Sequence, residues 1–556
     1  MKKQPTNTKK PKQPLKENLL MKYAWLWLSL AVLLVYTPTV NLGFTELDDT
    51  IFIKEMGAYN KDASNLFTSF RRGVFSDSKG TYYRPLLLNS FIINAAFSKQ
   101  QIGGYHIVNI LLHLGAVLLL FVLLQKLGIK KMAAFCLSML FAVHVVLTQA
   151  VTWIPGRNDT LLALFVFSFF IAGINYGRSP ERKWLIFQFV ALLAALFTKE
   201  TAVFALPVAW LLCIFLPQKS WKDTKAMSMY GVWIAGALIY FLARSQANLE
   251  QSGLAIKELL GSALGRFPVI LAYLGKVFLP FNLSVFPMLQ DMTLLYGFLT
   301  LAGLGVLVYF SRKNNWRMML VGASTFVLFL IPALLVPDAV NNQDFEHRLY
   351  VPMLGMLLLL SETVLLKNNW SERHLAMGTG ALVLVLALMN WYRQPLFNDP
   401  ISFWKAAVES SPNSAYANMM LAARLDNTDM QRAKTLMQKA YDLDPNQKYI
   451  NYYQGSLLVT EGKLLESEPY FLAEIKNSDY YKCYSPLAEI AFKKQDPNAA
   501  IQYLEKYLAV DGADVEMNNN LLMLYLQSNQ LEKARDQAAK MRLRGLTIPA
   551  DFQGKF

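Results

Sequence analysis

The sequence predicts an all-α protein: a polytopic membrane helix bundle followed by a soluble helical repeat. Three observations lead to this class. The 556 residues are 54% hydrophobic and 13% aromatic, more apolar than the usual soluble protein. About 11 apolar runs approach the ~20 residues that a helix needs to cross a bilayer. After these runs the composition turns soluble, and self-similarity recurs every 33 to 34 residues.

Residues 1–22 form a basic tail, rich in Pro, Gln and Asn, before the first apolar run. That run is too long for a secretory signal and lacks a small-residue cleavage site, so we expect an uncleaved membrane helix behind a disordered cytoplasmic tail. The net charge of +15 comes mainly from this tail and from short loops. Such placement sets membrane topology and does not indicate a nucleic-acid partner.

The expected membrane domain covers residues 23–392. An odd number of spans places the two chain ends on opposite sides, and the basic loops, such as QKLGIKKM and SRKNNWRMM, fall on the side of the tail, as the positive-inside rule requires. The alternation holds only if the segment 266–280 does not cross, so we expect it to be interfacial or re-entrant. The spans start near Tyr23, Tyr105, Met132, Thr160, Trp184, Ala202, Met227, Thr293, Met318, Tyr350 and His374.

The other segments face the outer side, beginning with the loop 41–104 and ending with everything after Trp391. A connecting helix is expected over 393–412 and about four repeats over 413–556. The small residues of the repeat are Ala433, Ser467, Ala500 and Ala534, and bulky residues follow four positions later at Met437, Phe471 and Leu504. This pattern is typical of tetratricopeptide repeats, whose paired helices stack into a concave surface. A plain helical bundle is the alternative.

The stretch FTELDDTIFI, residues 44–53, places acidic side chains directly after the first span. Adjacent carboxylates repel each other, so one of Asp48 and Asp49 can stay ionised as a base while the other holds a cation or a hydrogen bond. A solvated acidic loop is the alternative.

Further polar side chains lie at the outer ends of other spans. Arg84, after Tyr82 and Tyr83, can bind a phosphate bidentately or merely snorkel to the surface. In GYHIVNILLH, His106 and Asn109 share a helix face with a second histidine; interhelical hydrogen bonds are the commoner use of such groups and metal ligation the rarer. The adjacent Lys199 and Glu200 could simply neutralise each other. The remaining candidates are His144, Arg157, Asp159, Glu346, His347, Arg348 and Tyr350.

All these candidates lie on one side of the membrane. A carboxylate base among several cations at the bilayer surface suits an anionic, lipid-linked substrate. The same arrangement suits an ion channel poorly, because the charges lie at the outer mouths and not through the depth of the spans.

The chain resembles the transmembrane and tetratricopeptide repeat O-mannosyltransferases in an ordered series of motifs followed by the repeats. The motifs are LDD, YYRPL, GYHIVN, FAVH, GRND, KET and EHRLYVP. These belong to the GT-C membrane glycosyltransferases, with the protein O-mannosyltransferases and the lipid A aminoarabinose transferases. The resemblance covers nearly the whole chain after the tail. Two residues depart from the family pattern: Val145 stands where Pro is usual, and Asn158 where a small residue is usual.

The resemblance implies an inverting transfer of a sugar, mannose or another hexose, from a polyprenyl-phosphate donor to a hydroxyl of a protein Ser or Thr. Asp48 would be the general base, assisted by Asp49, and Arg84, Lys199 and Arg348 would bind the donor phosphate. The other candidates would bind substrate: Tyr82, Tyr83, His106, Asn109, His144, Arg157, Asp159, Glu200, Glu346 and Tyr350. No metal ligand is assigned, and a divalent cation stays open.

The expected location is a bacterial inner membrane, with the N-terminus cytoplasmic and the repeats periplasmic, where they would hold the acceptor protein. Short loops, a compact repeat domain and the lack of an organellar signal lead to this expectation. A lipid or glycan acceptor is one alternative. A non-enzymatic membrane scaffold with repeats is the other alternative. A transporter is disfavoured, because the sequence shows no obvious inverted halves or paired broken spans.

Overall fold

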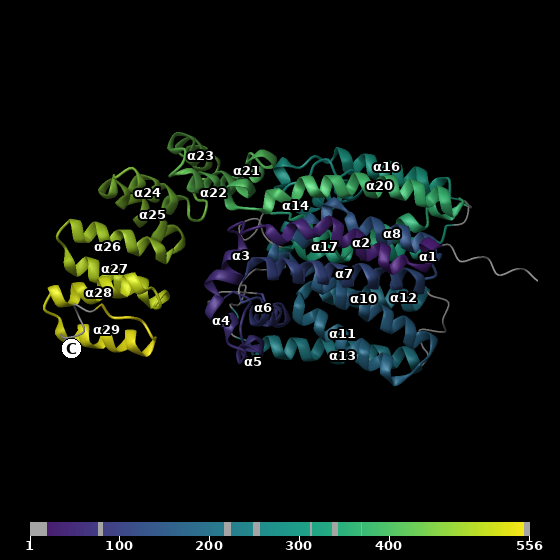
Figure 1. Ribbon diagram of the computed structural model, residues 1–556, viewed down its shortest axis with the longest axis horizontal. Coiled ribbons are helices and arrows are strands. Elements are labelled where there is room, and N and C mark those ends of the chain that lie inside the picture. The colour runs from purple at the N-terminus through teal and green to yellow at the C-terminus, as the bar shows by residue number, and fades with distance from the viewer. Residues whose placement is uncertain are drawn as a thin grey trace, which may run out of the picture. The chain divides into compact units, whose positions relative to one another are not determined.

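The computed structural model describes residues 19–75, 82–99, 101–215, 224–247, 249, 256–311, 314–335, 343–368 and 370–549. The predicted tail lies almost wholly outside these residues. Within them every regular element is helical apart from one isolated bridge between Met288 and Gln343, which confirms the all-α class. The chain divides into two compact units, Met1–Phe403 and Trp404–Phe556 (Figure 1). The division falls inside the segment 393–412 that was expected to connect them.

The first unit contains long apolar helices. Among the described residues, six are long and apolar enough to cross a membrane, and a bent pair, Lys131–Val143 with Val145–Thr152, makes a possible seventh. This establishes a multi-pass architecture by length and composition. The helices concerned are α2 (Ala24–Tyr36), α7 (Ile102–Lys126), α8 (Lys131–Val143), α9 (Thr148–Thr152), α10 (Arg157–Arg178), α13 (Thr224–Ser245), α17 (Trp316–Leu334) and α20 (Glu372–Arg393).

The other predicted spans also contain helices, each of fewer than 18 residues. They are α11 (Arg182–Thr198), α12 (Ala205–Phe215), α16 (Leu295–Tyr309) and α18 (Pro352–Ser361). Every predicted span therefore coincides with a helix, while the count of about eleven crossings stays a prediction. In the segment 266–280, α15 (Pro268–Phe278) has 11 residues and is about 16 Å long, roughly half the thickness of the hydrocarbon core. Its length fits the re-entrant prediction.

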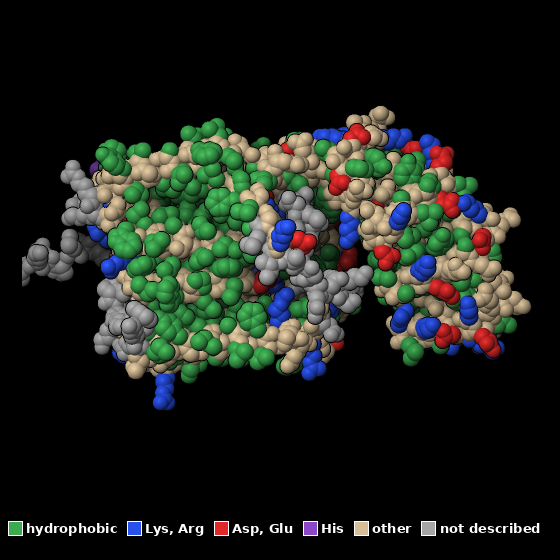
Figure 2. Space-filling model, turned by 180° about the vertical axis from the view of Figure 1, so that it is seen from behind, with side chains coloured by type: hydrophobic (Ala, Val, Ile, Leu, Met, Phe, Trp, Pro, Cys, Tyr) green, Lys and Arg blue, Asp and Glu red, His purple; other side chains and the backbone are tan. Residues whose placement is uncertain are grey.

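Apolar side chains explain why these segments are helical. A bilayer offers no hydrogen-bond partner to the backbone, so each crossing segment must satisfy its own N–H and C=O groups. Large side chains such as Leu34, Ile234 and Leu384 point outward and are at least 60% exposed, which suits a lipid environment. Figure 2 shows hydrophobic side chains covering the visible face of the first unit, whereas Lys, Arg, Asp and Glu are dispersed over the second.

Two glycines bring α17 and α18 into close contact. A Cβ on Gly322 would lie 2.6 Å from the carbonyl oxygen of Gly355, and a Cβ on Gly355 would lie 2.3 Å from that of Gly322. Any larger residue at either position would force the helices apart. The contact matters for the site because α18 begins directly after the short 3₁₀ helix η8 (Glu346–Leu349).

The described part of the loop 41–104 is itself folded. It contains α3 (Asp48–Thr50), a single π-helical turn η2 (Ile51–Glu55), α4 (Gly57–Lys61), α5 (Asn65–Thr68) and α6 (Pro85–Ser98). Phe52 stacks on Phe91 with ring centroids 4.9 Å apart, and the Asn60 side chain donates to the carbonyl of Phe52 at 2.6 Å. This small core fixes the π turn, and with it the acidic pair at its start.

The second unit begins at Trp404, within α21 (Pro400–Ser410), and contains four helix pairs within residues 415–543. The pairs are α22 (Ala415–Leu425) with α23 (Met430–Leu443), α24 (Ile450–Thr460) with α25 (Glu468–Ser478), α26 (Tyr484–Lys493) with α27 (Pro497–Val510), and α28 (Val515–Gln527) with α29 (Leu531–Leu543). The four small repeat residues, Ala433, Ser467, Ala500 and Ala534, are completely buried. The helical-repeat architecture is therefore confirmed.

Glu474 is an acidic side chain buried within the repeats, and its contacts explain its presence. This fully buried carboxylate accepts hydrogen bonds from the backbone N–H groups of Tyr449, at 2.8 Å, and Asn451, at 3.1 Å. Tyr449 is the residue before α24 and has a left-handed backbone with φ of 75°. Glu474 on α25 therefore satisfies the free donors at the start of α24.

Candidate functional site

The two adjacent carboxylates of the first outer loop have different surroundings. Asp49 is buried and accepts four hydrogen bonds: from the N–H and hydroxyl of Thr45, at 2.6 and 3.0 Å, and from the N–H groups of Leu47 and Thr50. Asp48 is partly exposed. Asp49 is thus occupied with holding the loop, and Asp48 is the carboxylate that solvent or a ligand can reach.

The chemistry of Asp48 follows from its place. Partial burial, then the charge of Asp49, raises its pKa to about 6, while Arg84 opposes the rise. The carboxylate is ionised at neutral pH but is a better proton acceptor than an ordinary aspartate. Burial also raises the pKa of Asp49, against the four hydrogen bonds that favour its charged form.

Arg84, at the start of α6, pairs with the glutamate of the next predicted motif. Its Nε and terminal nitrogen donate to the two carboxylate oxygens of Glu200 at 2.9 and 2.5 Å, a bidentate geometry. The guanidinium also lies 4.5 Å above the ring of Tyr82. With its amide oriented to satisfy both ends, Asn158 accepts from Arg84 at 2.9 Å and donates to the carbonyl of Thr198. The residue that departs from the family pattern therefore touches the candidate site.

Lys199 and Glu200 do not neutralise each other. The ammonium of Lys199 donates to one oxygen of Asp159 at 2.7 Å, and both side chains are buried. The other oxygen of Asp159 lies 4.0 Å from Nε2 of His347. Burial, then the positive charges of Lys199, Arg348 and Arg84, lowers the pKa of His347 well below its usual value, so its imidazole is neutral. Three motifs far apart in the sequence, GRND, KET and EHRLYVP, thus meet at Asp159.

The segment 343–349 carries Arg348 into the same cluster. Arg348 donates to the carbonyl of Gln343 at 2.8 Å and lies 3.8 Å from a carboxylate oxygen of Asp344. That carboxylate is fully buried and is already paired with Arg266 at the end of α14 (Ile256–Arg266). Because Arg348 shares its counter-ion, it is the cation of the cluster with the weakest pairing to a carboxylate.

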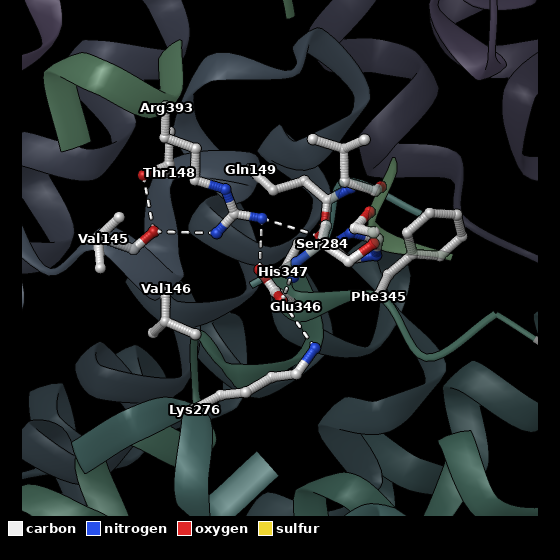
Figure 3. A network of polar contacts seen from close by, with 12 residues as sticks. Val145, Val146, Thr148, Gln149, Lys276, Ser284, Phe345, Glu346, His347 and Arg393 are labelled. Carbon is white, nitrogen blue, oxygen red and sulfur yellow. Dashed lines mark hydrogen bonds and ion pairs between the residues drawn. The ribbon is translucent and has the colours of Figure 1, made fainter. Parts of the chain in front are cut away.

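Glu346 has its own set of partners, and three segments converge on it (Figure 3). Lys276 of α15 donates at 2.7 Å, the N–H of Ser284 at 2.8 Å, and Arg393 at the end of α20 lies at 2.5 Å. Burial alone would raise the pKa of Glu346, but Arg393 and Lys276 hold it below its usual value. The glutamate is completely buried.

Arg157 makes its contacts outside the cluster around Asp159. It is completely buried, and its guanidinium donates to the side-chain oxygens of Asn109 and Asn94, both at 2.9 Å, and to the carbonyl of Tyr105 at 3.0 Å. The guanidinium carbon also lies 4.4 Å from the centroid of the Phe91 ring, a cation–π contact. This arginine links α6, α7 and α10, which hold Arg84, His106 and Asp159.

The remaining predicted residues make structural contacts. Tyr350 and His113 are hydrogen-bonded at 2.6 Å, and Tyr83 donates to the carbonyl of Phe70. His144 ends α8 and contacts the carbonyl of Val277 at 2.9 Å. Asn109 donates to three carbonyls in the segment 151–154, all at 3.2 Å, while His106 is buried on the same helix.

The structure therefore gathers Asp48, Arg84, Glu200, Asp159 and Lys199, together with His347 and Arg348, on one side of the bundle. Sequence reasoning missed the roles of Asn158, Arg266, Asp344 and Arg393. Lys276 interrupts the apolar stretch 266–280, and an ionisable group within such a stretch is itself a signal of a buried partner. Within the described residues, no three His, Cys, Asp or Glu side chains form a group that could hold a metal ion.

The fold and this cluster define a multi-pass helical membrane protein with a charged cluster built from several helix ends and an appended helical repeat. Among curated proteins, the chain is 35% identical over 191 residues to protein O-mannosyl-transferase Tmtc1 of Drosophila melanogaster, covering 33% of this chain and 22% of that protein. It is 23% identical over 391 residues to protein O-mannosyl-transferase F38B6.6 of Caenorhabditis elegans, covering 67% and 56%. Mouse protein O-mannosyl-transferase TMTC3 is 21% identical over 549 residues, covering 80% and 59%.

These relatives confirm the resemblance to the transmembrane and tetratricopeptide repeat O-mannosyltransferases. The matched regions span 22% to 59% of the length of these three proteins. No protein-family model matches the chain. Among solved structures, MamA of Desulfovibrio magneticus RS-1 aligns with 18% identity over 26% of this chain and 84% of its own, at a TM-score of 0.23, which is too low to inform the fold.

Proposed function

We propose that the protein is an inverting glycosyltransferase that moves a hexose from a polyprenyl-phosphate donor to a protein hydroxyl. The observation that supports this most is the pair of neighbouring loop carboxylates with divided roles. Asp49 holds the loop through four hydrogen bonds, and Asp48 stays accessible, with a pKa raised to about 6 and Arg84 within electrostatic range.

In this mechanism Asp48 accepts the proton of the acceptor hydroxyl as the hydroxyl oxygen attacks the anomeric carbon of the sugar. The bond between that carbon and the phosphate oxygen breaks, and the configuration at the carbon is inverted. The bonding electrons leave with the lipid phosphate. A carboxylate with a pKa near 6 combines a high ionised fraction at pH 7 with useful basicity.

Arg84, Lys199 and Arg348 would stabilise the departing phosphate. The donor is a phosphodiester with one negative charge, and its phosphate gains a second charge as the sugar leaves. Glu200 and Asp159 already orient two of these cations, so no reorientation is needed as the charge develops. Because a phosphate held in this way is a good leaving group, no second carboxylic acid is required.

The names of the relatives support a protein acceptor and mannose as the sugar. We further propose that the second unit holds that acceptor, and that the site and the repeats face the outer, periplasmic side of a bacterial inner membrane with the N-terminus in the cytoplasm. The proposal assigns no metal ligand and leaves room for a divalent cation that assists the reaction.

The proposal is tested by mass spectrometry of outer-side proteins from cells that lack the chain, complemented with the wild type or with Asp48→Asn. We expect a hexose on Ser or Thr that returns with the wild type only. If the missing hexose is found on a lipid or glycan instead, the acceptor assignment fails while the enzyme class stands. If glycosylation is the same in all cells, the enzyme proposal fails.

A further inference from the structure

Glu346 and its partners lie behind the candidate site, where the mechanism does not use them. Lys276, Ser284 and Arg393 come from three segments and all engage this one buried carboxylate (Figure 3). Arg393 also donates to the carbonyls of Val145 and Ser284, at 3.3 and 2.8 Å. A buried carboxylate with this many charge-assisted contacts has a single permitted position.

The neighbouring residues of η8 are fixed in the same manner. The backbone N–H of His347 donates to the side-chain oxygen of Gln149 at 3.3 Å, and Gln149 in turn donates to the carbonyl of Val285. Asp344, two residues before Glu346, pairs with Arg266. Carboxylates on either side of Phe345 therefore anchor the chain that leads to Arg348.

Charge adds a second argument. The two anchoring carboxylates, Asp344 and Glu346, engage four cations: Arg266, Lys276, Arg348 and Arg393. All these side chains are buried except that of Arg348, which is 16% exposed. Arg348 is therefore the member of this group through which an anion can reach it.

We propose that Glu346 is a positioning residue: with Lys276 and Arg393 it holds η8 so that Arg348 presents its guanidinium to a lipid-linked phosphate. This inference rests on the proposed function and replaces the substrate contact that the sequence predicted for Glu346. Its carboxylate acts through Arg348 and does not itself touch the ligand.

The test is a double-mutant cycle on the full chain in lipid nanodiscs, with undecaprenyl phosphate as the probe and undecaprenol as its neutral counterpart, read by native mass spectrometry. Glu346→Gln should weaken binding of the phosphate by about 10- to 100-fold, because a misplaced positioning group costs that much, and should leave undecaprenol unaffected. Since Glu346 acts through Arg348, the same change should add little in an Arg348→Ala background.

Glu362 supplies the matched control. It is also a buried glutamate, paired with Lys367 at 2.6 Å and with the N–H of Asn315 at 2.8 Å, but it follows α18 at the end away from η8. Glu362→Gln should bind the phosphate as the wild type does. If Glu346→Gln does not fold, Lys276→Met takes its place in the cycle. It removes one of the three partners of the carboxylate and should weaken phosphate binding in the same direction, while Arg393 and Ser284 still compensate the buried charge.

The inference is overturned if the folded variant binds the phosphate as tightly as the wild type, if its loss adds fully to that of Arg348→Ala, or if Glu362→Gln causes an equal loss. A wild-type chain that does not prefer undecaprenyl phosphate over undecaprenol contradicts the proposed donor itself. The two failures are therefore distinguishable.

Discussion

The two units both bury carboxylates, but three of those in the first unit are stabilised by other groups than Glu474 in the second. In the first unit Asp159, Asp344 and Glu346 are paired with Lys and Arg side chains. In the second unit Glu474 accepts from two backbone N–H groups and from Ser478. A carboxylate held by backbone donors closes a gap in the fold, whereas one held by cations also orients those cations.

This difference indicates where a functional site can lie in such a chain. Burying a charge is costly unless it is paired, so a regular repeat uses it sparingly, at a helix start. The first unit places several buried pairs next to the accessible Asp48 and Arg348, and accepts the cost where an anionic ligand can use the cations. Substitutions in the two units should therefore separate activity from stability.

The largest expected effect is on transfer by Asp48→Asn. The amide has the same shape but cannot accept the proton, so the rate of sugar transfer should fall by about 10²- to 10⁴-fold. The thermal midpoint should stay near that of the wild type. Initial rates with a lipid-linked sugar donor and a melting curve of the same sample give both values.

Asp49→Asn is the matched control for this change. It should lower the thermal midpoint, because an amide cannot accept all four hydrogen bonds that Asp49 receives. Transfer retained by Asp48→Asn would remove Asp48 as the base and place the chemistry elsewhere.

In the second unit, Glu474→Gln should cost stability and leave the chemical step unchanged. An uncharged amide accepts the N–H groups of Tyr449 and Asn451 less well, a loss of about 1–3 kcal/mol. Hydrogen exchange of the full chain should show faster exchange over α24 than over α28. Equal exchange in both helices would mean that Glu474 does not fix the start of α24.

The pH dependence of sugar transfer also distinguishes Asp48 from the buried glutamate of the second unit. Asp48 must be ionised to act as a base, so transfer should be highest above its pKa of about 6 and fall as pH decreases through that value. At pH 5 the rate should be about a tenth of its plateau. Glu474→Gln should show the same profile as the wild type. A rate that is constant between pH 5 and 8 contradicts the assignment of the base.

The smallest expected effect concerns an exposed carboxylate of the repeats. Asp429 caps α23 by accepting from the N–H of Arg432 at 3.1 Å, and Asp429→Ala should cost about 1 kcal/mol. Urea unfolding of the full chain, followed by circular dichroism, measures the change. A cost as large as that of Glu474→Gln would erase the distinction between buried and exposed carboxylates in this unit.

The helices were predictable because apolar runs and a repeat of small residues are local signals. All four repeat residues, Ala433, Ser467, Ala500 and Ala534, are buried as their spacing predicts. The lengths of the membrane helices were less predictable. His144 has an extended backbone that ends α8, and short 3₁₀ turns at Val145–Leu147 and Glu200–Phe204 interrupt apolar runs.

The members of the candidate site were predictable as motifs, but their partners were not. Lys199 is adjacent to Glu200 in the chain, yet it pairs with Asp159, and Glu200 pairs with Arg84. Which carboxylate meets which cation depends on how α6, α10 and α11 pack, and no local pattern contains that information. Arg157 was indistinguishable from a surface arginine until its neighbours Asn94 and Asn109 were in place.

The π turn at Ile51–Glu55 sets how this loop can change through evolution. A π turn holds one residue more than an α turn, and here it follows α3, whose first residue is Asp48, and is held at Phe52 by a hydrogen bond from Asn60. Side chains along the turn can be exchanged while the backbone path is kept. Gain or loss of a single residue would rotate Asp48 out of alignment with Arg84. We therefore expect relatives that retain the activity to vary in residue type here but not in length.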